Sequence, residues 1–351
     1  MASFNRQLYS WYNLNKRDLP WRTTRNPYFI WVSEIILQQT RVAQGLPFYL
    51  RYIDRFPDIA TLASAEEDEV LKMWEGLGYY SRARNMHKAA RTIVADYKGQ
   101  FPLEYEAIRA LPGIGDYTAA AIGSIAFNLP VAAVDGNVAR VISRYLGIKQ
   151  PVDQTIGIKL IREAAAALLG NNDPALHNQA MMELGALVCK PQRPDCHQCP
   201  IHENCFAAAS NEIDLLPVKS KQLIKRERWF TFIIIETPNE LLLEKRGAND
   251  IWKGLYQFTL IENNISPSDA EILQHPLVNQ WLTVESAEVK HLSEPIVHLL
   301  THQRITARFL HLKLSHLPPN IPSGIRANKA ELFTFAFPVL IKNHLKKMKL
   351  L

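Results

Sequence analysis

The sequence predicts a multidomain protein in which a mainly helical region precedes an α+β domain. With 351 residues, the chain is long enough for about two domains. Alanine-rich stretches of high helix propensity lie within residues 1–210, whereas runs of β-branched and aromatic residues fill 229–351. Between them, residues 211–228 (NEIDLLPVKSKQLIKRER) are polar and basic and contain a proline, which predicts a linker.

Three segments of the first region carry helix signals. IREAAAALLG (161–170) has strong helix propensity and ends at Gly170, a natural C-cap. ALHNQAMMELGALV (175–188) has the same propensity. SAEEDEVLKMW (64–74) predicts a helix with Ser64 as its N-cap and acidic residues in its first turn.

The second region reads as strands and a final helix. WFTFIIIE (229–236) predicts a strand, TPNE (237–240) a turn, and LLLEKR (241–246) a second strand. HLLTHQRITARFLHLKL (298–314) alternates apolar and polar residues as a strand does. The tail FPVLIKNHLKKMKLL (337–351) predicts a basic amphipathic helix. The layout is therefore that of an α+β domain.

Composition narrows the class of protein only loosely. Lysine and arginine total 40 against 34 acidic residues, which gives a net charge of +6 and a pI near 9.0. This balance suits an anionic partner such as nucleic acid but does not identify one. The first twenty residues lack the pattern of a signal peptide, and no apolar stretch has the length of a membrane span. We expect a cytoplasmic, intracellular protein without membrane association.

All four cysteines of the chain, Cys189, Cys196, Cys199 and Cys205, lie in one loop, residues 189–205. Prolines interrupt any long helix in this loop. The spacing of the cysteines is C-x6-C-x2-C-x5-C. A disulfide pair is disfavoured in a large intracellular protein, and coincidence explains such clustering poorly. Four thiolates can close a zinc site, although only one CxxC pair is present. They can equally hold a [4Fe–4S] cluster, so the spacing leaves both metals open.

The segment EAIRALPGIGDYTAAAIGSIAF (106–127) predicts a helix, a short glycine-rich turn and a second helix. Gly113 and Gly115 permit backbone conformations that other residues avoid, and they leave amide N–H groups bare. Such amides at a helix N-terminus favour a phosphate. The pattern therefore favours a helix-hairpin-helix that grips a DNA backbone. A plain helical hairpin with a glycine turn is the alternative.

The helix predicted for NPYFIWVSEIILQQTRV (26–42) carries an acidic residue in an apolar run. Asn26 is a plausible N-cap, and Pro27 occupies the first helical position. Burial of Glu34 within FIWVSEIIL would raise its pKa, and a Glu that holds a proton near neutral pH is a general acid. The commoner outcome for a helical Glu is an exposed position.

A second acidic residue, Asp135, lies in the apolar segment VAAVDGNVARV (131–141). An Asp that precedes a helix is usually only an N-cap. Two carboxyl groups whose environments separate their pKa values would instead supply an acid and an ionised partner, as in glycoside hydrolysis. The sequence does not show whether Glu34 and Asp135 meet in space.

Several motifs in order resemble the endonuclease III superfamily of DNA glycosylases, and within it the adenine DNA glycosylases of the MutY family. They are LPWR (19–22), WVSEIILQQTRV (31–42), WEGLGYYSRARN (74–85), VDGNVARV (134–141) and NQAMMELGALVC (178–189), together with the hairpin and the cysteine spacing. The resemblance is dense over residues 5–210 and loose beyond. It implies a helix-hairpin-helix glycosylase domain with a [4Fe–4S] loop, followed by an α+β Nudix-like domain.

The resemblance also implies catalytic roles. Glu34 would protonate the adenine ring, and Asp135 would stay ionised and stabilise the positively charged sugar, by its charge or by transient covalent capture. Tyr117 and Asn137 would orient this carboxylate site. Lyases of the superfamily carry a lysine nucleophile at the position of Tyr117, eighteen residues before Asp135, so the chain is expected to hydrolyse with water.

DNA-contacting residues follow from the same motifs. Arg22 and Gln179 match positions near the extruded adenine. Gln39 and Tyr79 match residues that wedge into the duplex when the base flips out, and core packing is the alternative for Tyr79 or its neighbour Tyr80.

The C-terminal domain resembles a Nudix-like module that reads 8-oxoguanine. IWKGLYQFTL (251–260) fits its strands, but no Glu-rich metal-binding box follows, so we expect binding without hydrolysis. The lesion-reading loop of the family has a His-x-Phe-Ser-His type signature, whereas residues 298–302 read HLLTH. Thr301 keeps the hydroxyl and His302 the imidazole, but Leu300 replaces the aromatic residue. Two chance histidines in a strand are the alternative.

The implied function is base-excision repair: monofunctional hydrolysis of the N-glycosidic bond of adenine mispaired with 8-oxoguanine or guanine in double-stranded DNA. We expect a monomer that associates with the nucleoid through this substrate. One alternative is a bifunctional pyrimidine-damage glycosylase and AP lyase, which Tyr117 disfavours. The other is a non-catalytic iron–sulfur DNA-binding protein, which the presence of both Glu34 and Asp135 disfavours.

Overall fold

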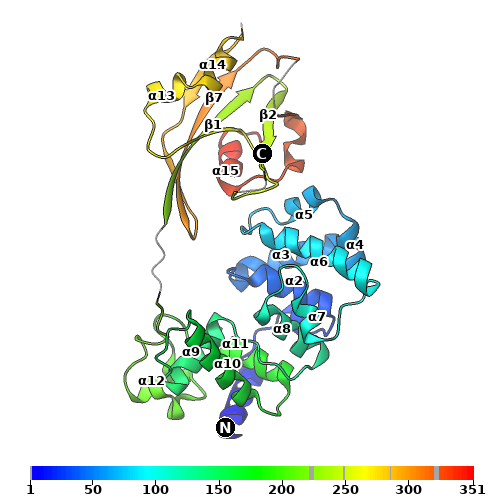
Figure 1. Ribbon diagram of the computed structural model, residues 1–351, viewed down its shortest axis with the longest axis vertical. Coiled ribbons are helices and arrows are strands. Elements are labelled where there is room, and N and C mark those ends of the chain that lie inside the picture. Colours follow the sequence, from blue (N-terminus) through cyan, green and yellow to red (C-terminus); the bar gives the residue numbers. More distant parts are fainter. Residues whose placement is uncertain (1, 221–224, 248–249, 285, 320–323) are drawn as a thin grey trace. The chain divides into compact units, whose positions relative to one another are not determined.

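A computed structural model describes most of the chain, namely residues 2–220, 225–247, 250–284, 286–319 and 324–351. It divides into two compact units (Figure 1). We call Met1–Ser64 with Asn85–Gln222 the helical unit, and Ala65–Arg84 with Leu223–Leu351 the mixed unit. Residues 221–224 of the expected linker lie outside the described residues. Within the described residues, no helix combines the length and apolar character needed to cross a bilayer.

The first 210 residues are helical, as the sequence predicts. The α-helices are α1 (Ala2–Asn15), α2 (Pro27–Leu37), α3 (Val42–Arg55), α4 (Ile59–Ser64), α5 (Glu67–Met73), α6 (Ser81–Tyr97), α7 (Tyr105–Arg109), α8 (Asp116–Phe127), α9 (Gly136–Leu146), α10 (Thr155–Leu169), α11 (Pro174–Leu187) and α12 (Phe206–Ala209). Short 3₁₀ turns are η1 (Pro20–Arg22), η2 (Cys196–Gln198) and η3 (His202–Asn204).

Helix α11 forms the centre of the helical unit. It packs against α1, α8 and α9, and its apolar residues Met181 and Leu184 join Leu8 and Ile142 in one buried cluster. The Asp173 side chain caps its first turn by accepting a hydrogen bond from Leu176 N at 2.9 Å. Neighbouring residues of α11 therefore face several helices at once, which allows this helix to position a site.

Two predicted helix boundaries differ from the structure. Gly170 caps α10 as predicted, with a left-handed φ of 54°. Ser64, however, is wrong as an N-cap, because it is the last residue of α4 and Glu66 occupies the N-cap of α5 without a side-chain bond. The helix expected over 26–42 begins after the Asn26 cap as predicted but already ends at Leu37.

The mixed unit is built on an eight-stranded sheet, counted over the described residues. The strands are β1 (Arg226–Glu236), β2 (Glu240–Lys245), β3 (Tyr256–Gln257), β4 (Thr259–Asn263), β5 (Glu288–Leu292), β6 (Ile296–Leu299), β7 (Gln303–Lys313) and β8 (Ile325–Asn328). The strand order is β3-β2-β1-β7-β5, with β4 beside β1, β6 beside β7 and β8 beside β2. Only β1 and β7 run parallel among these pairs.

Helices cover both faces of this sheet, which explains the continuous apolar run of β1. Phe232 and Ile234 pack toward α15 (Val339–Lys347), the basic helix predicted for the tail. Ile233 and Ile235 point to the opposite face, where they meet α13 (Asp269–Leu273) and α14 (Pro276–Leu282). A strand buried on both faces loses the alternation of a half-exposed strand. A final 3₁₀ turn, η4, spans Lys329–Thr334.

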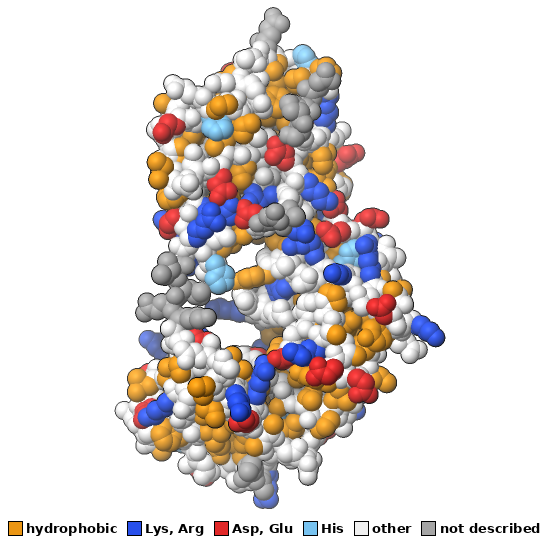
Figure 2. Space-filling view, in the orientation of Figure 1, with side chains coloured by type: hydrophobic (Ala, Val, Ile, Leu, Met, Phe, Trp, Pro, Cys, Tyr) orange, Lys and Arg blue, Asp and Glu red, His pale blue; other side chains and the backbone are white. Residues whose placement is uncertain are grey.

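Residues 298–314 form two strands, not one. Strand β6 pairs antiparallel with β7, and the turn between them contains Leu300, Thr301 and His302. Leu300 N donates to Gln303 O at 2.9 Å and closes this turn. On the face of the molecule in Figure 2, cationic and acidic side chains are interspersed over each unit. This face therefore shows no patch of a single charge sign.

Candidate active site

The helical unit contains a cavity of about 1150 Å³ whose walls come from α2, α8, α9 and α11. Four residues singled out from the sequence meet in it: Glu34, Tyr117, Asp135 and Asn137. Glu34 comes from α2, Tyr117 from the first turn of α8, and the other two from the start of α9. The cavity thus joins both carboxyl groups in one chemical environment.

Glu34 is buried on the apolar face of α2, with 9 % of its surface exposed. Its Oε2 accepts a hydrogen bond from the Tyr117 hydroxyl at 2.5 Å. The pKa of Glu34 is raised to about 7, mainly because the group is buried; the Tyr117 hydrogen bond and the charge of Arg22 oppose this shift, and the charge of Asp135 adds to it. A carboxyl group with this pKa can hold and release a proton near neutral pH.

Asp135 is both an N-cap and a cavity residue, so the two interpretations of the sequence are compatible. Its Oδ1 accepts from Val138 N at 2.7 Å, which caps α9, and its Oδ2 accepts from the Asn137 side-chain amide at 2.7 Å. Burial raises the pKa of Asp135, and these hydrogen bonds counteract it because they stabilise the ionised form. Both carboxyl groups therefore have raised pKa values, and the bonds from Val138 N and the Asn137 amide favour the ionised form of Asp135.

Asn137 is fixed from both ends, through residues that the sequence analysis missed. Its side-chain oxygen accepts from Arg140 Nη2 at 2.8 Å, and Arg140 also donates to the Gly185 and Cys189 carbonyl oxygens at 2.8 and 2.7 Å. A Cβ on Gly185 would lie 2.6 Å from the Asn137 Cβ and 2.9 Å from its backbone oxygen. A glycine in a helix interior is the signal that could have revealed this close approach.

Arg22 and Gln179 also line the cavity. Arg22 donates to both oxygens of Glu183, at 2.9 and 2.7 Å, and Arg17 pairs with the same carboxylate. The Glu183 side chain is completely buried. Burial alone would raise its pKa, but the hydrogen bonds from the two arginines hold the pKa at about 2. Sequence reasoning missed Arg17 and Glu183, for which the signal was an acid beside the apolar residues Met181, Met182 and Leu184 of α11.

The glycine-rich hairpin forms α7, a turn and α8, as predicted. Gly113 has a φ of 78°, and a Cβ there would lie 2.6 Å from the Asn85 Cβ, so the position requires glycine. Gly115 does not: its φ of −96° is open to any residue, which corrects the expectation for this position. A Cβ on Gly115, the N-cap of α8, would meet nothing within 4 Å, and both Gly113 and Gly115 are exposed.

The four cysteines lie in the loop after α11 and line one pocket. Arg144 Nη1 approaches Cys189 Sγ at 3.5 Å, and burial raises the pKa of the Cys199 thiol to about 12. Among the described residues, no three His, Cys, Asp or Glu side chains converge closely enough to hold a single metal ion. The four thiols therefore lie around one space.

Gln39 and Tyr79 share an unusual backbone conformation. Both are exposed, and both have positive φ values, 57° and 47°. Such strain in residues other than glycine is costly and is concentrated at functional sites. Tyr80, by contrast, is 5 % exposed, and its hydroxyl accepts from Gly76 N at 3.2 Å. Tyr80 therefore packs in the core, whereas Tyr79 does not.

The turn between β6 and β7 presents two of the expected lesion-reading side chains. Thr301 and His302 are exposed, and the Tyr79 hydroxyl contacts Thr301 Oγ1 within the mixed unit. Leu300 is partly buried against the core that contains α15. The residue that departs from the family signature thus packs inward, while the polar ones face solvent.

Known proteins resemble both regions of the chain. Residues 32–175 match a family described as HhH-GPD superfamily base excision DNA repair protein, and 230–347 match a NUDIX domain. A solved structure of a thermostable thymine-DNA glycosylase has a TM-score of 0.55 and 30% identity, covering 59% of this chain and 95% of that one. A trapped endonuclease III–DNA intermediate, 22% identical over 59% of this chain and 96% of that one, shares the fold with a TM-score of 0.51.

Full-length relatives give the more specific comparison. An adenine DNA glycosylase of Buchnera aphidicola subsp. Baizongia pistaciae is 34% identical over 94% of this chain and 88% of the relative. Adenine DNA glycosylases of Mus musculus and Homo sapiens are 33% and 32% identical, over 93% and 97% of this chain and 74% and 73% of theirs. With this identity along both regions, the chain belongs to the adenine DNA glycosylase family.

Proposed function

We propose that the protein is a monofunctional adenine DNA glycosylase that hydrolyses the N-glycosidic bond of adenine opposite 8-oxoguanine or guanine in duplex DNA. The observation that carries this proposal is the pair Glu34 and Asp135 in one cavity, where the pKa of Glu34 is raised to about 7 and Asp135 accepts hydrogen bonds that favour its ionised form. Their pairing is the arrangement that hydrolysis of a glycosidic bond requires.

The chemistry follows from the contacts of each side chain. With the adenine nucleotide extruded into the cavity, Glu34 donates its proton to a ring nitrogen and makes the base a neutral leaving group. Asp135, kept charged by hydrogen bonds from Asn137 and Val138, stabilises the cationic sugar as the bond breaks. Tyr117 fixes Glu34 through its hydroxyl. Water then attacks the sugar carbon, which completes hydrolysis.

The cavity lining favours water over an amine as the nucleophile. A lyase needs a lysine that attacks the sugar. Among the described residues that line the cavity there is no lysine, and Tyr117 occupies the position that lyases of the superfamily give to one. We therefore propose base release without strand cleavage.

We propose that Cys189, Cys196, Cys199 and Cys205 hold a [4Fe–4S] cluster. A zinc ion binds four thiolates at about 2.3 Å each and needs them close together. The four thiols line one pocket, and their C-x6-C-x2-C-x5-C spacing is the one that the resemblance to the endonuclease III superfamily associates with a [4Fe–4S] cluster. Arg144 of α9 ties this loop to the helix, because it contacts Cys189 Sγ and donates to two carbonyl oxygens of the loop. A bound cluster would in addition join the four thiols of the loop to one another.

The remaining residues are proposed to contact DNA. Arg22 and Gln179 would border the extruded base inside the cavity. Gln39 and Tyr79 would wedge into the duplex and fill the space that the extruded base leaves. The strained backbone of both residues supports this role. Amides at Gly113 and Gly115 would bind a phosphate at the N-terminus of α8.

The lesion itself would be read by the mixed unit. Thr301 and His302 present a hydroxyl and an imidazole to solvent, and Leu300 supports the turn from below. This domain is proposed to bind 8-oxoguanine without hydrolysing it. The substrate would place the protein, acting as a monomer, with the nucleoid inside the cell.

A duplex assay tests the function directly. The proposal predicts that free adenine is released from a duplex containing adenine opposite 8-oxoguanine or guanine, and that the strand breaks only after alkali is added. Strand breakage without alkali would establish the lyase alternative. A protein that binds the duplex but releases no base would establish the non-catalytic alternative.

A further inference from the structure

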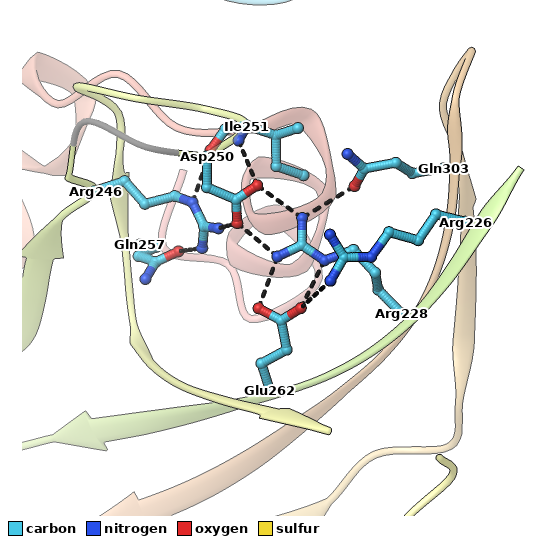
Figure 3. Close-up of polar contacts among 8 residues, drawn as sticks. All are labelled: Arg226, Arg228, Arg246, Asp250, Ile251, Gln257, Glu262 and Gln303. Carbon is cyan, nitrogen blue, oxygen red and sulfur yellow. Dashed lines mark hydrogen bonds and ion pairs between the residues drawn. The ribbon is translucent and has the colours of Figure 1, made fainter. Parts of the chain in front are cut away.

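Arg228 is a buried cation that the proposed chemistry does not use. It lies on β1 with 3 % of its surface exposed, over the ring of Phe230 at 4.7 Å. All five of its N–H groups have an acceptor (Figure 3). They bind Glu262 Oε1 and Oε2 at 2.7 and 2.6 Å, Asp250 Oδ1 and Oδ2 at 2.8 and 2.5 Å, and Gln303 Oε1 at 3.0 Å.

The acceptors come from three separate segments. Glu262 lies on β4, Asp250 precedes β3, and Gln303 is the first residue of β7. The two carboxylates already neutralise Arg228, and Arg246 shares Asp250 as a second cation. Gln303 is therefore not needed to neutralise the charge of Arg228. Its contribution is geometric, because it occupies the last donor of the guanidinium and ties the start of β7 to this buried group.

The start of β7 is also the end of the β6–β7 turn that contains Thr301 and His302. Next to Gln303, the His302 carbonyl accepts from Arg226 N at 2.9 Å, so backbone and side-chain bonds hold this end of the turn. At its other end, the His298 ring lies 5.9 Å from the ring of Trp252. The exposed tip of the turn therefore lies between two ends that are held by contacts with the rest of the mixed unit.

We propose that Arg228 is a positioning residue for lesion discrimination, which acts by holding Gln303 and thereby the turn 300–302 in one geometry. This inference rests on the proposed reading of 8-oxoguanine by that turn. The lesion differs from guanine by one carbonyl and one N–H, so a reader must place its polar atoms within about 0.5 Å. Two exposed residues on a turn do not hold such a position unless the residues at both ends of the turn are held rigidly.

The buried guanidinium supplies that rigidity. Its planar fork fixes the direction of every bond it makes, and lysine would not reproduce this pattern. Gln303 cannot move away without leaving a buried donor unpaired, which is costly. Structural stabilisation alone would predict an effect on unfolding but none on the choice between two bases.

The test compares full-length wild type with Gln303→Leu, which removes the acceptor, and Gln303→Asn, which shortens the side chain so that its oxygen no longer reaches Arg228. Gln303→Glu keeps an acceptor within reach and serves as the rescue variant. Arg304→Gln is the matched control, since it removes an exposed ion pair with Glu227 one residue further along. Each protein is measured for single-turnover adenine excision opposite 8-oxoguanine and opposite guanine, and for its melting temperature.

We expect Gln303→Leu and Gln303→Asn to lower the ratio of the two rates by about fivefold to tenfold, through the lesion duplex alone. Gln303→Glu and Arg304→Gln should keep the wild-type ratio. An unchanged ratio in Gln303→Asn, whatever its melting temperature, overturns the inference. A wild-type protein that excises adenine equally opposite both bases overturns the proposed lesion reading itself, which separates the two failures. If Gln303→Leu does not fold, Gln303→Asn alone decides.

Discussion

Replacing Tyr117 with phenylalanine should extend adenine excision to higher pH. The Tyr117 hydroxyl donates to Glu34 at 2.5 Å and stabilises the ionised form of this carboxyl group. It is one of the influences that oppose burial, and with all of them acting the pKa of Glu34 is about 7. Without the hydroxyl, burial and the charge of Asp135 act with less opposition, so the pKa of Glu34 should rise further.

The size of the shift follows from the strength of the bond. A hydrogen bond to a charged group contributes about 1.5–3 kcal/mol, and one pKa unit corresponds to about 1.36 kcal/mol. Loss of the hydroxyl should therefore raise the pKa of Glu34 by about one to two units. Glu34 must be protonated to act as the acid, so activity declines as pH rises through its pKa. The alkaline limb of the pH–rate profile should accordingly move upward, even if the maximal rate falls.

The assay is single-turnover excision of adenine between pH 5 and 10 for wild type and Tyr117→Phe. Tyr28→Phe is the matched control, because the Tyr28 hydroxyl is also buried but donates to the Phe56 carbonyl, away from the cavity lining. Its alkaline limb should coincide with that of wild type. An alkaline limb that stays in place or moves to lower pH in Tyr117→Phe would refute the assignment of Glu34 as the acid.

Three further perturbations test other parts of the site. Gly185→Ala should slow excision by about 10- to 100-fold, because the new Cβ would displace Asn137. Gly247→Ala is the control and should keep the wild-type rate, because a Cβ there meets nothing within 4 Å. Equal excision rates for Gly185→Ala and wild type would contradict the close approach of Gly185 to Asn137. Glu183, whose pKa is lowered from 4.5 to about 2, should contribute about 3 kcal/mol of stability above pH 4.5 that is lost as pH falls toward 2. In Glu183→Gln, the free energy of unfolding measured with denaturant should not show this loss at acid pH. If wild type and Glu183→Gln lose stability in parallel as the pH falls, the contribution assigned to Glu183 is excluded. Anaerobically purified protein should absorb in the visible range and Cys199→Ser should lose that absorption; colourless wild type with stoichiometric zinc would overturn the iron–sulfur proposal.

The local parts of the site could be predicted from sequence. Asn26 and Pro27 fixed the start of α2, and the apolar run of that helix made burial of Glu34 one of two possible outcomes, the one that the structure shows. The end of the helix was not predictable, because no glycine or proline follows Leu37 and the backbone turns at Gln39 through a strained positive φ. Capping signals are local, whereas helix ends of this kind depend on packing.

Partners across the fold were beyond the sequence. Glu183 finds Arg17 and Arg22 at separations of 166 and 161 residues, and no local pattern encodes such pairs. Ser64 looked like an N-cap by residue type, but the preceding helix continues through it. Asp135 was an N-cap and also a cavity residue, because a carboxyl group has two oxygens and each serves one purpose.

The central claim is that a charged Asp135 promotes departure of adenine activated by Glu34, and the Asp135→Asn variant tests it most directly. The measurement is single-turnover adenine excision together with the dissociation constant for the same duplex. We predict that excision falls by at least about 10²–10³-fold while the dissociation constant stays close to that of wild type. Normal excision by a variant that binds the duplex weakly would contradict the claim.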